Sequence, residues 1–360
     1  KADRTSLGAL DSKKGTGMKA AKLISPGKIR VMEEQPVRAP RQGEAVVKVK
    51  AVGICGTDLH IFKEGRGDVE LPRVMGHELS GVVAAVGDGV GHISVGDRVV
   101  LDPVMSCGLC RTCRAGRGNV CADVKCFGVQ MDGGFQEEIV VPAASLYRFP
   151  KPYSFVQAAL AEPFSVAANI LNRLSVKEND FVAVMGAGTI GLSLVQGAKA
   201  AGAKVLISDI EEVKLEKARE IGADYTVNSQ KEDLADTVKK YTETGADVVI
   251  DAVGTVKLTE QSLELAAPCG RIGVISFDAR PAQIPAAAIT KRELSLIGSR
   301  MNAHRFPDVI RWMEEGALNL DAMISKVYPA EEIQRAFEET LADSSTVKTV
   351  IIMEEEDRCV

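Results

Sequence analysis

Four cysteines that fall within fifteen residues constrain the fold of this chain more than any other feature of its sequence. They follow the spacing C-x2-C-x2-C-x7-C and are Cys107, Cys110, Cys113 and Cys121. Four thiolates complete the tetrahedral coordination of a structural Zn²⁺ and leave no position open for a substrate. Because the metal supplies folding free energy, such a lobe needs no hydrophobic core of its own. The spacing predicts a structural zinc lobe over residues 101–125, with disulfides and an iron–sulfur cluster as alternatives.

The composition is that of a globular protein large enough for two domains. The chain has 360 residues, of which 46% are hydrophobic and 26% charged, and a formal net charge of -5. This acidic balance argues against nucleic acid or an anionic membrane as a partner, and no apolar run reaches the roughly 20 residues of a membrane span. Residues 1–17 lack the apolar region of a signal peptide. We interpret them as an expression leader before Met18 and expect a cytoplasmic protein.

Residues 18–164 have the pattern of a mostly β domain. Segments rich in β-branched residues are separated by turn signals that contain glycine and proline. A further strand precedes the cysteine lobe, and β character returns after the glycine pair at 133–134. The expected strands are 45–52, 81–86, 98–101 and 135–142.

From residue 165 to 299 the pattern changes to short buried strands that alternate with helices. This alternation predicts a doubly wound α/β domain with a parallel sheet covered on both faces. Residues 300–360 are too short to fold alone, so we expect them to return to the first domain. The expected strands are 181–185, 204–208, 223–227, 247–251, 271–275, 294–298 and 347–353. The expected helices are 189–201, 212–221, 233–242, 257–266, 306–315 and 330–341.

A glycine-rich turn after the first strand of the second domain indicates a dinucleotide site. Gly186 would allow the tight turn, Gly188 the approach of a pyrophosphate to the helix N-terminus, and Gly191 close packing of helix on strand. Asp209, which ends the next strand, would accept hydrogen bonds from the adenosine ribose. Its charge favours NAD over NADP, which carries a 2′-phosphate. The alternative is a doubly wound domain that uses these glycines only to form a turn.

A second candidate metal site is dispersed along the first domain. Cys55 follows an expected strand, His77 and Glu78 come about twenty residues later, and Glu162 stands near the domain junction. A catalytic zinc takes about three protein ligands and keeps one position open. Cys55 and His77 are suitable ligands, and either Glu78 or Glu162 could be the third. None of these residues is informative alone, but together with a dinucleotide site they predict a metal-dependent dehydrogenase.

Taken in order, these motifs make the sequence resemble the zinc-dependent medium-chain dehydrogenase/reductase family over residues 18–353. The resemblance implies a GroES-like, mostly β catalytic domain joined to a Rossmann cofactor domain, and so the fold class α/β. The Glu162-Pro163 pair is similar to the polyol and sugar-acid branch, which includes sorbitol dehydrogenase. Other segments look most like bacterial L-galactonate/L-gulonate 5-dehydrogenases. The motifs are 53–60, 76–78, 96–99, 132–135, 161–164, 186–191 and 298–302, together with the four cysteines.

The resemblance implies a role for each metal-site residue. Cys55, His77 and Glu78 would hold the catalytic zinc, and Glu162 would be a ligand or would bind the zinc water. Arg300 would lie beside Glu162 and contact substrate or cofactor. The residues that correspond to cofactor contacts in the family are Thr189, Ile190, Lys214, Ile275, Ser276, Phe277 and Ser299, in addition to the three glycines and Asp209.

These features predict an oxidoreductase that uses zinc and NAD to interconvert a secondary alcohol of a sugar acid or polyol and the ketone. Thr57 and His60 could carry the substrate proton outward, because the unperturbed pKa of histidine is about 6.5. Ile61 and Met301 replace tyrosines of animal sorbitol dehydrogenases, which argues against sorbitol itself.

Two other functions remain open from the sequence. L-threonine 3-dehydrogenases share most of the zinc and NAD pattern, and a non-enzymatic regulator could retain the same fold. For each reading we expect two Zn²⁺ per chain, bound NAD, a small-molecule ligand and a homo-oligomer, either a dimer or a tetramer.

Overall fold

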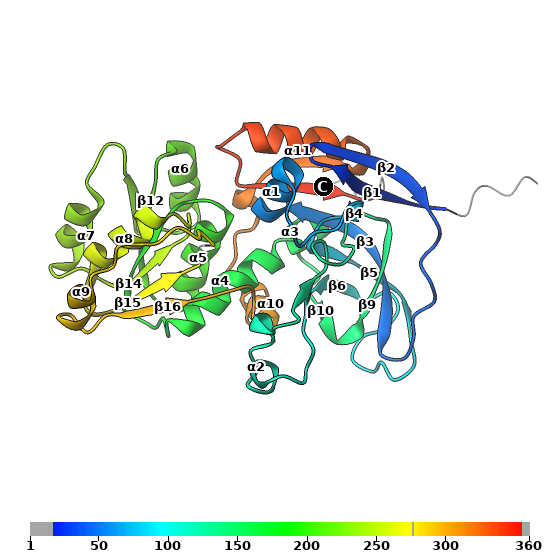
Figure 1. The fold of residues 1–360 in the computed structure, drawn as a ribbon, viewed down its shortest axis with the longest axis horizontal. Coiled ribbons are helices and arrows are strands. Elements are labelled where there is room, and N and C mark those ends of the chain that lie inside the picture. Colours follow the sequence, from blue (N-terminus) through cyan, green and yellow to red (C-terminus); the bar gives the residue numbers. More distant parts are fainter. Residues whose placement is uncertain (1–16, 276, 355–360) are drawn as a thin grey trace, which may run out of the picture.

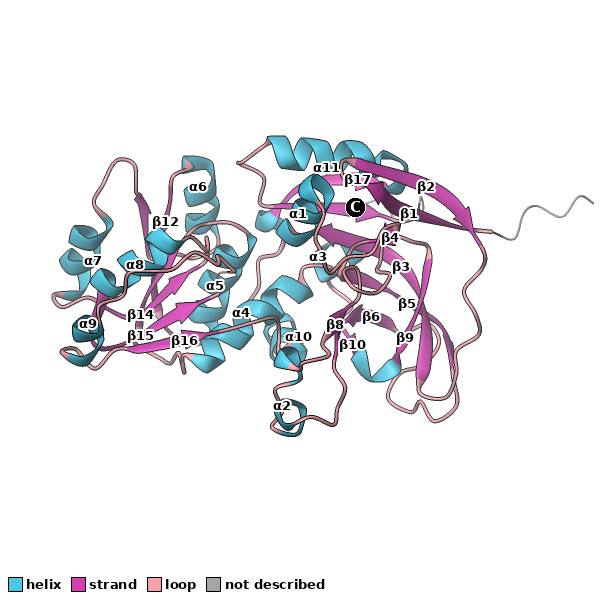
Figure 2. Ribbon diagram, viewed as in Figure 1, coloured by secondary structure: helices cyan, strands magenta, loops and turns pink. Residues whose placement is uncertain are grey.

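The computed structural model describes residues 17–275 and 277–354. Ser276 and residues 1–16 of the expected leader lie outside the described part of the chain. Figures 1 and 2 show a β-rich part, which contains the first and last described segments, beside a part built on a parallel sheet. Within the described residues, no helix has the length and apolar character needed to cross a bilayer.

The β-rich part contains a large sheet with strand order β10-β6-β5-β3-β18-β17, in which β9 also pairs with β3, and a small sheet with order β2-β1-β4. Buried Val47, Val49 and Val52 of β3 belong to the core of this part, whereas Lys48 of the same strand is exposed. The strands are β1 (Met18–Ser25), β2 (Lys28–Glu34), β3 (Glu44–Ile54), β4 (Arg73–Val74), β5 (Glu78–Val86), β6 (Arg98–Leu101), β9 (Glu138–Pro142), β10 (Leu146–Arg148), β17 (Ile324–Pro329) and β18 (Lys348–Ile352).

The end of the chain completes this sheet. Strand β18 pairs antiparallel with β3, and Thr349 lies opposite Ile54. This register brings Lys348 next to the segment that leads into Cys55. Helix α11 (Ile333–Ala342) packs its Phe337 ring 5.2 Å from Phe62 and 5.7 Å from Phe135, measured between ring centroids.

The second part is the doubly wound domain that the alternating pattern predicted. Its six strands are parallel and have the order β13-β12-β11-β14-β15-β16, the Rossmann order. Alternate residues of β11 enter two different cores, one on each face of the sheet. The strands are β11 (Phe181–Met185), β12 (Lys204–Asp209), β13 (Tyr225–Asn228), β14 (Ala246–Asp251), β15 (Ala266–Val274) and β16 (Ser295–Gly298), and the helices are α5 (Thr189–Ala200), α6 (Glu212–Glu220), α7 (Leu234–Thr242), α8 (Val256–Leu265) and α9 (Ala286–Thr290).

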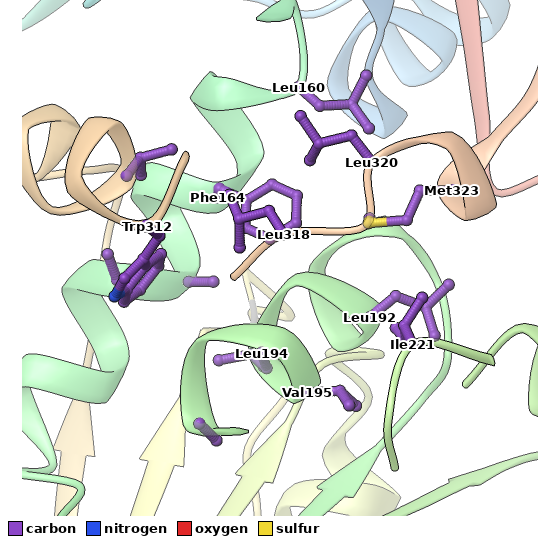
Figure 3. Close-up of a cluster of buried hydrophobic side chains, with 14 of the residues drawn as sticks. Leu160, Phe164, Leu192, Leu194, Val195, Ile221, Trp312, Leu318, Leu320 and Met323 are labelled. Carbon is purple, nitrogen blue, oxygen red and sulfur yellow. The ribbon is translucent and has the colours of Figure 1, made fainter. Parts of the chain in front are cut away.

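Helix α4 (Ala161–Arg173) connects the two parts, and the boundary expected after residue 164 falls inside it. The helix packs against α5 and α10 (Phe306–Glu314), and Figure 3 shows the apolar side chains between them, among them Phe164, Leu194 and Trp312. Ten of its thirteen residues are buried. The two parts are therefore joined by a continuous core around α4. The β-rich part also contains the helices α1 (Gly56–Glu64) and α3 (Phe155–Ala158). Short 3₁₀ turns are η2 (Ala143–Ser145), η3 (Asp321–Met323) and η4 (Ala330–Glu332).

The cysteine lobe projects from the β-rich part, where α2 marks it in Figure 1. Strands β7 (Val104–Met105) and β8 (Lys125–Cys126) close its base, and α2 (Arg111–Arg114) and η1 (Gly118–Val120) lie between them. From residue 106 to 125 only Gly118, Asn119 and Cys121 are buried. The lobe therefore lacks a core of its own, as the cysteine spacing led us to expect.

Candidate active site and metal centres

The four cysteines of the lobe converge in a tetrahedral arrangement. Their Sγ atoms lie 3.9 Å apart for Cys107–Cys113, 3.4 Å for Cys110–Cys113, 3.8 Å for Cys110–Cys121 and 3.5 Å for Cys107–Cys121. A Zn–S length of about 2.3 Å implies tetrahedron edges of roughly 3.8 Å. These separations fit one Zn²⁺ and are far above the roughly 2.05 Å of a disulfide. The disulfide alternative is therefore wrong for this cluster.

Two of the four cysteines of the lobe are shifted toward the thiolate form that a metal requires. The Thr112 hydroxyl, 3.1 Å from Cys110 Sγ, and the Cys113 backbone lower the pKa of Cys110 to about 6. Backbone N–H groups of Leu109 and Cys110 lower the pKa of Cys107. For Cys121, a backbone hydrogen bond lowers the pKa, but burial and the neighbouring thiols outweigh it and raise that pKa to about 11. A bound metal ion would displace the proton from Cys121.

A second cluster joins Cys55, His77 and Glu78, whose ligand atoms all lie within 4.8 Å of one another. Cys55 precedes the first residue of α1, and Glu78 begins β5, which pairs with the end of β3 at Gly53. A Cβ atom at Gly53 would stand 2.2 Å from Glu78 Oε2, so the close approach requires glycine. The glycine and cysteine of the Gly53-Ile54-Cys55 motif thus serve one site.

Asp58 supports this cluster, and the sequence analysis did not single it out. Its buried carboxylate accepts hydrogen bonds from the backbone N–H of Cys55 at 2.9 Å and of Gly76 at 3.4 Å. It also lies 3.6 Å from His77 Nδ1, a buried nitrogen without a hydrogen-bond partner among the described residues. A carboxylate placed behind a ligating histidine fixes its ring orientation. The orphaned imidazole and the donor set of sulfur, nitrogen and oxygen fit a catalytic Zn²⁺.

The charges in this cluster act on His77. Burial alone would lower the pKa of His77, but the Asp58 carboxylate and the Cys55 thiol outweigh burial and hold that pKa well above its usual value. The cluster is therefore a strongly negative environment that attracts a cation. A bound metal ion would take the place of the proton on His77.

Lys348 is the functional residue that the sequence analysis missed. Its buried ammonium donates to both carboxylate oxygens of Glu78, at 2.8 and 2.7 Å, and to Ile54 O at 3.0 Å. The Glu78 carboxylate is thus engaged by a cation of the protein itself. A lysine inside the apolar segment 347–353 was the available signal, because lysine is almost never fully buried unless it is paired.

Glu162 stands in the first turn of α4 and is 8% exposed. Within the described residues it is not in the group of ligand atoms formed by Cys55, His77 and Glu78. Burial raises the pKa of its carboxyl to about 7, and the positive charge of His77 opposes that rise. Glu162 therefore borders the cluster as a carboxyl that can hold or release a proton near neutral pH.

The remaining expected catalytic residues are on α1 and in the segment after β16. Thr57 and His60 occupy consecutive turns of α1, and His60 is exposed, 3.8 Å from Glu64. No hydrogen bond joins Thr57 to His60 in the part of the chain that the structure describes. The Arg300 carbonyl accepts from Asn119 Nδ2 at 2.6 Å and Asn169 Nδ2 at 3.1 Å, which ties its segment to the lobe and to α4.

The glycine turn has the geometry expected for a dinucleotide. Gly186 has φ +98°, and a Cβ atom there would meet Val253 at 2.4 Å, while one at Gly191 would meet the Gly186 carbonyl at 1.8 Å. Around a Cβ placed on Gly188 there is open space within 4 Å. Asp209 ties the turn to β12 by accepting from Ala187 N at 2.6 Å. The turn therefore leaves room at the N-terminus of α5 where a pyrophosphate would bind.

The other residues expected at the cofactor differ in their surroundings. Thr189 Oγ1 donates to Val347 O at 2.6 Å, and Ile190 packs against the core around α4. Lys214 lies in the first turns of α6, and Ile275 is partly buried after β15. The ring of Phe277 is 80% exposed, and Ser299 Oγ is buried without a partner among the described residues.

Comparison with known proteins agrees with both parts of the chain. The alcohol dehydrogenase GroES-like domain matches residues 41–151, and the zinc-binding dehydrogenase domain matches residues 189–315. The starvation-sensing protein RspB of Escherichia coli K12 is 38% identical over 89% of this chain and 94% of its own length. The 2-dehydro-3-deoxy-L-galactonate 5-dehydrogenase of Pseudoalteromonas atlantica is 36% identical over the same shares of the two chains.

A solved structure extends the agreement to three dimensions. The crystal structure of the alcohol dehydrogenase rspB from E. coli CFT073, in complex with NADH, superposes with a TM-score of 0.87 at 36% identity. It covers 94% of this chain and all of the other. The chain therefore belongs to the zinc-dependent medium-chain dehydrogenase family, whose members are oxidoreductases that act on alcohol groups.

Proposed function

We propose that this protein uses zinc and NAD to interconvert a secondary alcohol of a sugar acid or polyol and the corresponding ketone. One observation carries the proposal: two hydrogen bonds of the adjacent residues Val347 and Lys348 link the dinucleotide turn to the metal cluster. Thr189 at the start of α5 donates to Val347 O, and the next residue, Lys348, holds the Glu78 carboxylate. The cofactor turn and the metal ligands are therefore two ends of one hydrogen-bonded unit.

The protein groups would bind the metal and move the proton. Cys55 and His77, with Glu78 or Glu162, would hold a Zn²⁺, which supplies Lewis-acid polarisation of the substrate hydroxyl. The raised pKa of Glu162 suits it to accept a proton near neutral pH, and Thr57 and His60 on α1 offer a route to solvent. NAD supplies the hydride chemistry, and the protein's part is to orient the reacting groups.

Asp209 supports NAD as the cofactor. Its carboxylate ends β12 and accepts hydrogen bonds from the backbone of Ala187, Ile210 and Glu211. A 2′-phosphate at this edge would meet the negative charge of Asp209 and of the neighbouring Glu211 and Glu212. The rspB structure at TM-score 0.87 contains NADH.

The resemblance to one branch of the family supports the proposed substrate class. The Pseudoalteromonas relative is named for a sugar acid, and this chain carries the Glu162-Pro163 pair expected for the polyol and sugar-acid branch. Arg300 gives the site a cation whose backbone is held in place by two asparagines. We therefore place sugar acids ahead of uncharged polyols.

NADH absorbance with a panel of substrates tests the proposal. The purified protein, loaded with zinc and supplied with NAD⁺, is offered aldonates, alditols and L-threonine in parallel. We expect NADH formation with an aldonate or an alditol. Turnover of L-threonine alone would replace this proposal with the amino-acid branch. Silence across the panel, with zinc and NADH both bound, would favour a dehydrogenase-like regulator.

We also propose that the protein is a cytoplasmic homo-oligomer. Strand β16 is at one edge of the parallel sheet, with Leu296 and Ile297 only partly buried. An open edge strand offers unpaired backbone groups to a second copy of the chain. Light scattering should give a mass of two or four chains, and a mass equal to one chain would contradict this assembly.

A further inference from the structure

A hollow of about 610 Å³ lies between the cysteine lobe and the cofactor domain, outside the Cys55–His77–Glu78 cluster. Its volume is within the range of small-molecule sites. Four arginines from three separate segments line it: Arg111 and Arg117 from the lobe, Arg173 from the end of α4, and Arg300 from the segment after β16. The apolar Phe277 and the hydroxyl residue Ser299 complete one wall.

These four arginines have no carboxylate partner within ion-pair distance among the described residues. Most other arginines of the chain do, as the pairs of Arg38 with Glu44, Arg219 with Glu212 and Arg335 with Glu339 show. The protein as a whole is acidic, with a net charge of -5. Positive charges that lie close together without a counter-ion destabilise the fold. Unfavourable arrangements of this kind are expected mainly at functional sites.

The arginines also act on one another. Partial burial of Arg117, together with the positive charges of Arg173 and Arg305, lowers the pKa of its guanidinium. Arg173 is held in place by a hydrogen bond from its Nε to Gly298 O at 2.7 Å. The arginine charges are therefore brought together by the fold, where the lobe, α4 and the end of β16 meet.

We propose that this arginine pocket is a subsite for an oxyanion, carboxylate or phosphate, carried by the substrate on the end away from the reacting carbon. Guanidinium groups bind both oxyanions through paired N–H donors. The inference rests on the proposed function and deepens it, because it makes an acidic group a requirement for efficient turnover.

The position of the pocket agrees with such a role. Phe277 and Ser299, which we expect at the cofactor, and Arg300, which we expect to contact substrate or cofactor, also line the pocket. The buried Ser299 Oγ has no hydrogen-bond partner among the described residues. Arg173 lies on the same helix as Glu162, eleven residues later, roughly 16 Å along the axis. Arg173 therefore lies at the end of α4 away from Glu162.

Anion binding can be tested without any turnover. We compare the Tm of the zinc-loaded wild type, Arg117→Gln, Arg111→Gln and the control Arg30→Gln in sodium phosphate and in sodium chloride of equal ionic strength. Arg30 is exposed on β2, outside the pocket. Phosphate should raise the Tm of the wild type and Arg30→Gln by the same amount, and that of Arg117→Gln by clearly less. Salt exclusion and phosphate binding at the glycine turn would raise the Tm of all variants alike. An equal rise in Tm for all four proteins would therefore contradict the proposed subsite.

Steady-state kinetics then identify the source of the oxyanion. With an aldonate, an alditol phosphate and a neutral alditol, Arg117→Gln should lower the ratio of kcat/KM for the acid to kcat/KM for the alditol by roughly tenfold, mainly through KM. Arg117→Lys should recover part of this ratio. The acid whose ratio falls in Arg117→Gln, the aldonate or the alditol phosphate, identifies the oxyanion that the pocket binds. An unchanged ratio for both acids would overturn the inference while leaving the dehydrogenase intact. Arg117→Gln could also change the oligomeric mass while phosphate still raises its Tm as in the wild type. That result would assign the arginines to a subunit contact and contradict the inference.

Discussion

At the scale of single residues, the site depends on charges that are buried and matched. Glu78 and Lys348 are 1% and 2% exposed at their side chains, and the ammonium bonds both carboxylate oxygens. Burial alone would lower the pKa of Lys348, but Glu78 and Cys55 raise it above its usual value. Lys348 therefore remains charged inside the protein, next to the proposed metal ligands.

Removing the Lys348 charge should destabilise the fold. Lys348→Met leaves the Glu78 carboxylate buried without its cation, a change that costs about 3–5 kcal/mol in comparable pairs. Chemical denaturation measures the free energy of unfolding. The matched control is Lys48→Met, because Lys48 is 46% exposed and pairs with Glu354 at the surface, where about 1 kcal/mol or less is expected. Equal stability of both variants would contradict the buried ion pair.

His304 should make stability depend on pH. Its Nδ1 lies 3.7 Å from the buried Asp102 carboxylate, and the proximity of this carboxylate raises the pKa of His304. A group whose pKa is higher in the folded state stabilises the protein fully below its unfolded pKa of about 6.5, and this stabilisation is lost as the pH rises through the folded pKa. The Tm difference between wild type and His304→Gln should be larger at pH 6 than at pH 9. A difference that grows with pH would refute the pairing.

At the scale of elements, the cysteine lobe is a metal-stabilised extension that also reaches the active site. It has few buried residues, but one of them, Asn119, donates to the Arg300 carbonyl at 2.6 Å. The structural metal would thus keep the Arg300 segment in place from a distance. The lobe needs the metal for its own folding, whereas the Cys55 cluster does not depend on the lobe for its ligands.

Cys110→Ser should separate the two metal sites. We expect the zinc content to fall from two to one per chain, measured by atomic absorption. The Tm should fall by roughly 2–4 °C for each kcal/mol of lobe stability that is lost. Cys269→Ser is the control, because Cys269 is exposed and outside both clusters. A variant that kept two zinc ions per chain would show that the lobe does not bind one.

The helices and strands that could be predicted from sequence are those whose hydrophobic residues recur with a clear period. Five of the six parallel strands of the cofactor domain were expected within two residues of their observed bounds, because buried strands alternate there with amphipathic helices. Strand β15 begins at Ala266, five residues before its expected start. Helix α4 was not expected, because ten of its thirteen residues are buried, including the polar residues Glu162, Ser165 and Asn169 that recur at helical spacing. Helix α1 was missed because it is only nine residues long, stands in a strand-rich region and has Thr57 and Asp58 in its first turn.

At the scale of the whole molecule, the active site is assembled from segments that are far apart in the chain. Cys55 and His77 come from the first quarter of the sequence, and Lys348, which holds Glu78, comes from its last strand. Ligand types and their spacing could be recognised from sequence because zinc chemistry restricts them. The Lys348 partner could not, because the antiparallel pairing of β18 with β3 brings it there and no local pattern encodes that pairing.

The arginine pocket belongs to the same scale. Its side chains come from the lobe, α4 and the segment after β16, so it exists only when both parts of the molecule are joined. The sequence suggested Arg300 as a partner for a carboxylate, but the contributions of Arg117 and Arg173 depend on the fold. Substrate selection would thus be a property of the interface between lobe and cofactor domain rather than of either part.

The central claim is that the Cys55 cluster, and not the denser cysteine lobe, holds the metal of catalysis. Zinc content and NADH formation in Cys55→Ser, with the best substrate of the panel and Cys110→Ser alongside, test it most directly. We expect Cys55→Ser to retain one zinc per chain and lose at least about a hundredfold in kcat, because Lewis-acid stabilisation is worth several kcal/mol. Cys110→Ser should also retain one zinc and lose far less in kcat, although KM for an acidic substrate should rise because the lobe carries Arg111 and Arg117. Full turnover by Cys55→Ser would contradict the account.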